Sequence, residues 1–171
     1  MYQPLCCYSG GTPFWLVNKE SSGTFLYLLG LDLLSIALVV WLQITSHNNP
    51  GLETYASVMS VVTCLLFVVT NLSYLLTTGM NPGIRNPASI PAHEYATKGK
   101  EKCAYCSRDR LLTMRHCTYC FICVEEKDHH CSVLNRCIAG KQVYPFVVLL
   151  ISVCATFLLF FVALIGGTIV M

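Results

Sequence analysis

Charged residues are scarce in this sequence. Lys, Arg, Asp and Glu together make up 12% of its 171 residues, whereas apolar residues make up 54%. Ordinary soluble domains carry about 25% charged residues. The deficit lies in residues 24–45, 55–78 and 145–171, which contain one formal charge between them, on Asp32. Each segment supplies the roughly 20 apolar residues that a bilayer-spanning helix needs. Because the rest of the chain is too short to cover them as a soluble core, the sequence predicts an α-helical polytopic membrane protein with three transmembrane helices.

A basic n-region is missing from residues 1–22, and the first apolar segment is too long for the apolar part of a signal peptide. We therefore expect this segment to act as an uncleaved membrane anchor. Basic residues favour the cytosolic side of short loops. Ten of the eleven Lys and Arg lie in residues 85–141, and none lies in residues 46–54. This distribution predicts a cytosolic N-terminal tail at residues 1–23, a lumenal loop at residues 46–54 and a cytosolic domain at residues 79–144.

Two features of the predicted cytosolic parts limit the possible functions. The basic residues are scattered among acidic ones without the stacking aromatic residues of a nucleic-acid-binding module, so we expect no nucleic-acid partner. Most of the eleven cysteines lie in a compartment predicted to be reducing. There, C-x2-C pairs with nearby histidines bind metal more often than they form disulfides. Cys6 and Cys7 form a pair in the N-terminal tail that is a candidate for lipidation.

A pattern of Cys and His recurs after fourteen residues. Cys103 opens a C-x2-C-x9-H-x6-C pattern, and Cys117 opens the same pattern again. Three Cys and one His complete a closed tetrahedral zinc site. The sequence therefore predicts two structural zinc ions, one bound by Cys103, Cys106, His116 and Cys123 and the other by Cys117, Cys120, His130 and Cys137.

The region between Cys103 and Cys137 has no helical or strand periodicity that lasts for more than a few residues. Its apolar residues are too few for a self-sufficient core. We therefore expect an irregular cysteine-rich domain, whose folding energy comes from metal binding.

Two closed zinc sites leave one Cys and one His of this region without a structural role. The pattern begins a third time at Cys131, but Leu134 stands where the partner Cys would be. His129 and His130 are adjacent and cannot easily reach the same metal. If His130 completes the second site, Cys131 is a candidate nucleophile, with His129 as its general base and Asp128 orienting the imidazole. The alternative that Cys131 is itself a zinc ligand stays open on spacing alone.

Asp32 is the charged residue inside a predicted span. Such residues are costly in hydrocarbon and often mark a functional site. We favour the structural alternative, in which Asp32 faces a neighbouring helix and pairs with a polar group such as Asn71.

The motif in this region resembles the cysteine-rich domain of the DHHC-type protein S-acyltransferases. Two helices precede the motif and one follows it, as in that family, and Asn81-Pro82-Gly83 is similar to the family's Asp-Pro-Gly element. The residues that carry the resemblance are Cys103-x2-Cys106, His116-Cys117-x2-Cys120-x2-Cys123, Asp128-His129-His130-Cys131 and Cys137.

The resemblance implies a protein S-palmitoyltransferase in a multi-pass membrane location, with the endoplasmic reticulum or Golgi as the default. It implies that Cys131 takes a fatty acyl group from palmitoyl-CoA and passes it to a cysteine of a substrate protein. The partners are then acyl-CoA, cysteine-containing proteins and the lipid bilayer, and the resemblance implies that the protein's own transmembrane helices enclose the acyl chain. Lys127, Arg136 and Lys141 are candidates for contact with the CoA phosphates or, equally, for a solvated surface.

The sequence departs from the family pattern at several positions. Ser132-Val133 replaces the Pro-Trp that usually follows the reactive cysteine, and Arg136 and Gln142 each replace an Asn. Arg115 replaces the first of a pair of His, and Ala139 a Gly. Most members have at least four spans, whereas this sequence ends at Met171 in or after its third. We therefore expect a divergent or C-terminally truncated member, with a catalytically inactive, zinc-stabilised membrane adaptor as the alternative.

Overall fold

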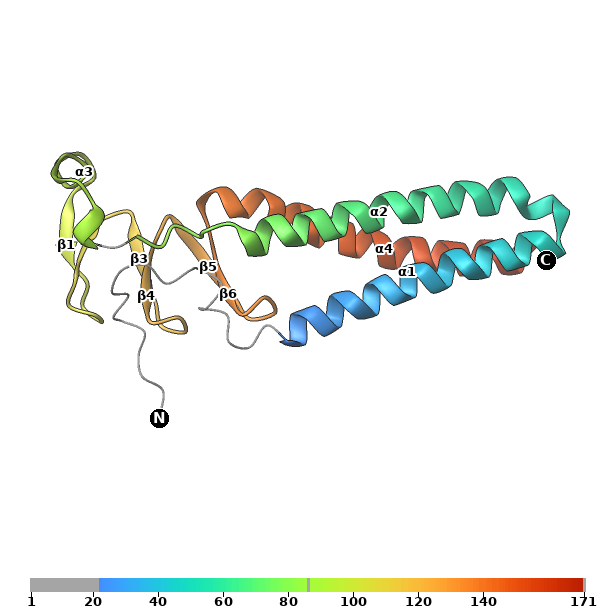
Figure 1. Ribbon diagram of the computed structural model, residues 1–171, viewed down its shortest axis with the longest axis horizontal. Coiled ribbons are helices and arrows are strands. Elements are labelled where there is room, and N and C mark those ends of the chain that lie inside the picture. Colours follow the sequence, from blue (N-terminus) through green and yellow to red (C-terminus); the bar gives the residue numbers. More distant parts are fainter. Residues whose placement is uncertain (1–21, 86, 171) are drawn as a thin grey trace. The chain divides into compact units, whose positions relative to one another are not determined.

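The computed structural model describes residues 22–85 and 87–170. Almost all of the predicted N-terminal tail, including Cys6 and Cys7, lies outside the described residues. The described chain forms two compact units. Residues 22–76 and 145–170 form a helical unit, and residues 77–144 form a unit that contains the cysteine-rich region (Figure 1).

Three apolar helices dominate the described residues. They are α1 (Ser22–Asn48), α2 (Glu53–Gly79) and α4 (Val143–Val170), and each is long and apolar enough to cross a membrane. A short 3-10 turn, η2 (Pro50–Leu52), joins α1 to α2. A continuous helix suits this composition because it satisfies every backbone polar group internally where no water is present. The three predicted apolar helices are therefore present.

The helical unit has a narrow apolar core and wide apolar outer faces. Leu38, Leu42, Ala56, Met59 and Ala163 are buried together, with Tyr55 packed against them. Large apolar side chains such as Leu33 and Leu65 are 58% and 62% exposed. Water-soluble helical domains rarely expose such extended apolar faces. The exposure matches helices that are surrounded by lipid.

Polar contacts also link the helices of this unit. The Asn71 side chain donates a hydrogen bond to Asp32 Oδ1 at 3.0 Å, which confirms the predicted pairing of Asp32. Gln43 Nε2 on α1 donates to Ser60 Oγ on α2 at 3.1 Å. Tyr55 Oη donates to the carbonyl oxygen of Val162 at 3.2 Å. Each contact partners a polar side chain that hydrocarbon alone would leave unsatisfied.

The second unit contains three β-hairpins, each a pair of antiparallel strands, instead of the predicted irregular structure. The hairpins follow one another in sequence order (Figure 1). The strands are β1 (Lys100–Lys102), β2 (Asp109–Leu111), β3 (Met114–Cys117), β4 (Ile122–Glu125), β5 (Lys127–Cys131) and β6 (Arg136–Ala139).

The prediction of an irregular domain was wrong because these strands are too short to show a period. They contain three to five residues each, and β6 is buried at all four of its positions, so no alternation of apolar and polar residues appears. The repeat is visible instead in the backbone conformation of the hairpin turns. Ser107, Phe121 and Asn135 have φ angles of 55°, 56° and 48°, and they lie fourteen residues apart. The fourteen-residue repeat therefore describes three copies of one hairpin.

A helix and an ion-pair network support the first two hairpins. The 3-10 turn η3 (Pro87–Ser89) leads to α3 (Ala92–Lys98). Arg85 pairs with Glu94 of α3 at 2.6 Å and with Glu125 of β4 at 3.2 Å, and Lys98 pairs with Glu125 at 2.6 Å. In the same unit, the side chains of Ile90, Leu111 and Met114 form a small buried cluster.

The network lowers the pKa values of both carboxyl groups. The hydrogen bond from Arg85 holds the pKa of Glu94 below its usual value. Burial raises the pKa of Glu125, but the hydrogen bonds from Lys98 and Arg85 outweigh it and keep this pKa low as well. A lowered pKa in the folded state stabilises the fold at neutral pH. That contribution is lost as the pH falls through the lowered values.

We predict that Asn71→Leu destabilises the helical unit, since it removes the hydrogen-bond donor to Asp32. Hydrogen bonds between membrane helices contribute about 0.5–2 kcal/mol, so we expect a loss of that size in the unfolding of detergent-solubilised protein. Leu72→Ala is the control, because Leu72 is adjacent in sequence but 54% exposed. Equal stability of Asn71→Leu and the wild type would show that the contact contributes nothing.

Candidate functional site

Two groups of Cys and His side chains stand out within the described residues. In each group, one ligand atom per residue lies within 4.8 Å of all the others. The groups contain the same residues that the spacing predicts: Cys103, Cys106, His116 and Cys123 in one, and Cys117, Cys120, His130 and Cys137 in the other.

The first group joins the first hairpin to the second. Cys103 and Cys106 come from the turn between β1 and β2. His116 and Cys123 are direct partners across β3 and β4, so their side chains leave the same face of that hairpin. Cys123 Sγ lies 3.8 Å from Cys106 Sγ and 3.7 Å from His116 Nδ1.

The second group joins the second hairpin to the third in the same way. Cys117 and Cys120 lie at the turn between β3 and β4, and His130 and Cys137 are direct partners across β5 and β6. His130 Nδ1 lies 3.3 Å from Cys120 Sγ and 3.6 Å from Cys117 Sγ. Cys120 Sγ lies 3.5 Å from Cys137 Sγ.

These separations fit tetrahedral zinc. A Zn–S bond of about 2.3 Å places neighbouring sulfur ligands about 3.8 Å apart in a tetrahedron. Cys106 and Cys123, with sulfur atoms 3.8 Å apart, and Cys120 and Cys137, at 3.5 Å, are near this value. Three thiolates and an imidazole are also a ligand set that zinc prefers, and they leave no open position for a substrate. Both groups are therefore suited to structural zinc.

Two tyrosines that the sequence analysis missed cover the ligand histidines. Tyr105 stacks on His116 with ring centroids 5.0 Å apart, and Tyr119 stacks on His130 at 4.8 Å. Stacking of this kind restrains the orientation of an imidazole. The signal was present in the sequence, because the two tyrosines occupy the same place in each C-x2-C pair, fourteen residues apart.

Cys131 occupies the place in the third hairpin that Cys117 occupies in the second. It belongs to neither of the two Cys/His groups, which we call the metal groups. It pairs with Arg136 at the end of β5 and β6 and begins the turn, as Cys117 does in the second hairpin. Among the described residues, Cys131 lies in neither Cys/His group, and Leu134 is buried where the second cysteine of the turn would be. The geometry thus argues against the alternative that Cys131 completes a zinc site.

Asp128 and His129 lie beside Cys131 on an irregular part of β5. The register shifts between Lys127 and His129, which leaves Asp128 as an extra residue without a cross-strand partner. Such a bulge redirects side chains. Asp128 Oδ2 and His129 Nδ1 are 3.0 Å apart. Since side chains alternate along a strand, His129 and Cys131 leave the same face, opposite to that of His130.

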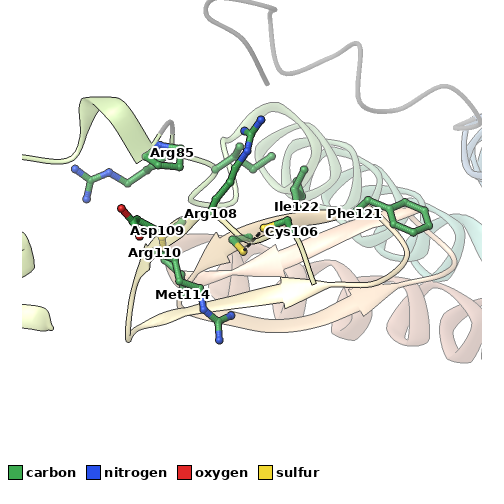
Figure 2. Close-up of a pocket in the computed structure, with 11 residues that line it drawn as sticks. Arg85, Cys106, Arg108, Asp109, Arg110, Met114, Phe121 and Ile122 are labelled. Carbon is green, nitrogen blue, oxygen red and sulfur yellow. Dashed lines mark hydrogen bonds between the residues drawn. The ribbon is translucent and has the colours of Figure 1, made fainter. Parts of the chain in front are cut away.

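A pocket lies next to the first metal group rather than next to Cys131. Figure 2 shows Phe121 at one end of it and Arg85 at the other, with Cys106 between them. Its lining includes none of Asp128, His129 and Cys131. A more open groove does reach Asp128. It is lined by Leu112, Thr113, Arg115, Glu126, Lys127, Asp128 and Val143.

Comparison with known proteins agrees with this arrangement. Residues 96–170 match the family model described as DHHC palmitoyltransferase. The probable protein S-acyltransferase 1 of Arabidopsis thaliana is 30% identical over 161 residues, which cover 93% of this chain and 46% of the relative. Palmitoyltransferase ZDHHC5 of Homo sapiens is 32% identical over 122 residues, which cover 62% of this chain and 17% of the relative.

The chain belongs to the DHHC palmitoyltransferase family. It spans less than half the length of these curated relatives.

The structure explains how Asn81 serves in place of the Asp of the family's Asp-Pro-Gly element. Asn81 Oδ1 accepts hydrogen bonds from the backbone N–H groups of Gly83 and Ile84, at 3.0 and 2.9 Å. An amide oxygen accepts these bonds as a carboxylate would. Gly83 has a φ angle of 94°, and a Cβ atom there would lie 2.9 Å from the carbonyl oxygen of Glu125. The Asn81 bonds shape the turn after α2, and the missing Cβ of Gly83 lets this segment approach the second hairpin, where Glu125 N–H donates to the carbonyl oxygen of Gly83 at 3.0 Å.

Another departure from the DHHC pattern has a structural role that the sequence analysis did not find. Arg136 is 5% exposed. It is therefore neither part of a solvated surface nor accessible for contact with the CoA phosphates. Its guanidinium group donates hydrogen bonds to the carbonyl oxygens of Thr78 and Met80. Gln142, which is fully buried, donates to the carbonyl oxygen of Thr77 at 3.0 Å. The prediction for Arg136 was therefore wrong, because sequence distance hides its contact with the end of α2.

We predict two zinc ions per chain in the purified protein, measured by elemental analysis. Cys123→Ser removes a ligand of the first group and is expected to lower the content to about one, since a closed zinc site needs all four ligands. Cys131→Ser is the matched control and is expected to retain two. Loss of zinc from Cys131→Ser would instead identify Cys131 as a ligand.

Proposed function

We propose that this protein is a protein S-palmitoyltransferase, which moves a fatty acyl group from palmitoyl-CoA to a cysteine of a substrate protein through an acyl-enzyme at Cys131. The observation that carries the proposal is the position of Cys131. It lies at a turn like those that hold metal ligands, outside both metal groups, and next to the paired side chains of Asp128 and His129. Membership of the DHHC palmitoyltransferase family supports the same reaction class.

The contact between Asp128 and His129 suggests a role for each residue. A carboxylate that binds Nδ1–H of an imidazole fixes the tautomer and leaves Nε2 to accept a proton. With Asp128 Oδ2 at 3.0 Å from Nδ1, His129 can act as a general base toward the Cys131 thiol. The negative charge of Asp128 then stabilises the imidazolium that forms. The same division of roles operates in other nucleophile–base–acid triads.

The reaction has two acyl transfers. In the first, His129 takes the proton of Cys131, whose sulfur attacks the thioester carbon of palmitoyl-CoA. The bond between that carbon and the CoA sulfur breaks, and CoA leaves as a thiol with the proton returned by the imidazolium. In the second, His129 takes the proton of the substrate protein's thiol, whose sulfur attacks the acyl carbon of the acyl-enzyme. The bond between that carbon and the Cys131 sulfur breaks, and the imidazolium returns the proton to Cys131. Cys131 is released as a free thiol, and the acyl group is now a thioester on the substrate.

The zinc ions have a structural role in this proposal. Bound to the eight Cys and His ligands, they supply folding energy that strands of three to five residues lack. The side chains of Asp128, His129 and Cys131 then carry the chemistry. The third hairpin holds these three residues on a strand in which His130, a member of the second Cys/His group, pairs with Cys137 of the same group.

The apolar helices suit a substrate with a long acyl chain. Val143, the first residue of α4, follows Cys131 by only twelve residues, so the proposed nucleophile is close in sequence to an apolar helix. Burial of an acyl chain contributes about 0.8 kcal/mol per CH₂ group. The basic residues around the motif favour the cytosolic side for this unit, where acyl-CoA and protein cysteines are available. The endoplasmic reticulum or Golgi is the proposed location.

Labelling with a clickable palmitoyl-CoA analogue tests the reaction. We expect the detergent-solubilised wild type to acquire a label that hydroxylamine removes, because a thioester is sensitive to that nucleophile. Cys131→Ser is expected to acquire none. Cys154→Ser, in α4, is the control and should label like the wild type. An unlabelled wild type that still contains two zinc ions would favour the alternative of an inactive membrane adaptor.

The roles of Asp128 and His129 are tested by the rate of this labelling. General base catalysis contributes about 10²–10⁴-fold, so His129→Gln is expected to slow acylation of Cys131 by a factor in this range. Asp128→Asn is expected to have a smaller effect, since it leaves the imidazole in place but removes the negative charge. A single-turnover measurement gives these rates. If His129→Gln acylates at the wild-type rate, His129 is not the base.

A further inference from the structure

We propose that Arg136 and Gln142 are positioning residues that hold Cys131 in its reactive place by fixing β6 to the C-terminal end of α2. This inference rests on the proposed function, because it takes Cys131 as the nucleophile. Both residues act through the backbone of the third hairpin.

The first step of the argument is what these side chains bind. The last carbonyl groups of an α-helix have no partner within the helix, and they carry the negative end of the helix dipole. Arg136 donates to the carbonyl oxygens of Thr78 and Met80, and Gln142 donates to that of Thr77. A buried guanidinium group is well matched to this end of a helix in both charge and hydrogen bonding.

The second step is how the contact reaches Cys131. Arg136 is the direct cross-strand partner of Cys131, so the two side chains leave the same face of the hairpin. Cβ atoms of such partners lie roughly 4.5–5.5 Å apart. Arg136 is the first residue of β6, and Gln142 lies beyond the other end of this strand, in the 3-10 turn η4 (Gly140–Gln142). The strand that pairs with β5 is thus held at both ends.

The third step is a comparison of the three hairpins. The turn of the second hairpin is held by a metal group, because Cys117 and Cys120 both belong to one. The turn of the third hairpin has Cys131 and Leu134 at those positions, and neither belongs to a metal group of the described residues. The contact of Arg136 with α2 therefore fixes the one turn that the metal ligands leave out.

Arg108 shows that an arginine at this place in a hairpin need not bind a helix end. It follows Cys103 by five residues, as Arg136 follows Cys131, and Cys103 N–H donates to its carbonyl oxygen at 2.9 Å. Its side chain is only half-buried and lines the pocket of Figure 2. Arg108 is therefore a matched control for Arg136.

Single-turnover acylation tests the proposal, with the clickable palmitoyl-CoA analogue as the probe. We expect Arg136→Met to lower the rate constant at saturating probe by about 10- to 100-fold, since a misplacement of about 1 Å can slow a reaction by that much. The amplitude of labelling, the half-saturating concentration and the zinc content are expected to stay at wild-type values. Gln142→Met is expected to have the same effect to a smaller degree.

Arg136→Lys and Arg108→Met complete the series. A lysine keeps the charge and can donate to one of the carbonyl groups, so we expect it to recover part of the lost rate. Arg108→Met is expected to acylate like the wild type. If Arg136 were needed only for folding, Arg136→Met would lower the amplitude of labelling, which is proportional to the fraction of active protein. The rate constant of the active fraction would then stay unchanged. A wild-type rate constant in Arg136→Met, or a loss of amplitude alone, would overturn the proposal.

Hydrogen exchange provides a second measurement that needs no activity. We expect amides of residues 127–139 to exchange faster in Arg136→Met than in Arg136→Lys or Arg108→Met, because the third hairpin is no longer held at its turn. Unchanged exchange would contradict the contact itself. If the wild type does not acylate at all, the proposed function fails, and hydrogen exchange alone then decides whether Arg136 holds the hairpin.

Discussion

The cysteine-rich unit is organised around two Cys/His groups, each of which takes its members from two consecutive hairpins. Two-stranded sheets with strands of three to five residues are not stable on their own in water. Each Cys/His group takes two ligands from the turn of one hairpin and two from a cross-strand pair of the next. This interleaving makes three weak hairpins into one unit and fixes the order in which they stack.

The same interleaving creates the proposed nucleophile. The first hairpin contributes two cysteines from its turn, and the second contributes two from its turn and two residues that pair across its strands. The third hairpin contributes only the cross-strand pair of His130 and Cys137. The turn of the third hairpin contributes to neither group among the described residues, and Cys131 lies there with Leu134 in place of a second cysteine. The bulge at Asp128 then brings a carboxylate to His129 on the same strand. A structural repeat has thus been adapted, in this proposal, to hold a reactive group.

Several features were predictable from the sequence because they are local or depend on composition. The apolar helices follow from segment length, and the pairing of Asp32 with Asn71 follows from the cost of an unpaired polar group in hydrocarbon. The two ligand groups follow from exact fourteen-residue spacing. The hairpins did not follow, because ligands and buried residues on both faces of strands such as β6 hide the alternation that identifies a strand.

By itself, the sequence determined the two Cys/His groups, the apolar spans and the family motif, since a metal's ligand set and a bilayer's thickness impose rules on spacing and length that need no fold. The tertiary structure alone decided what Arg136 contacts. That side chain bonds to carbonyl groups 56 and 58 residues away in the chain, and backbone carbonyl groups carry no sequence signal. Only folding shows that the end of α2 needs donors and that the third hairpin supplies them.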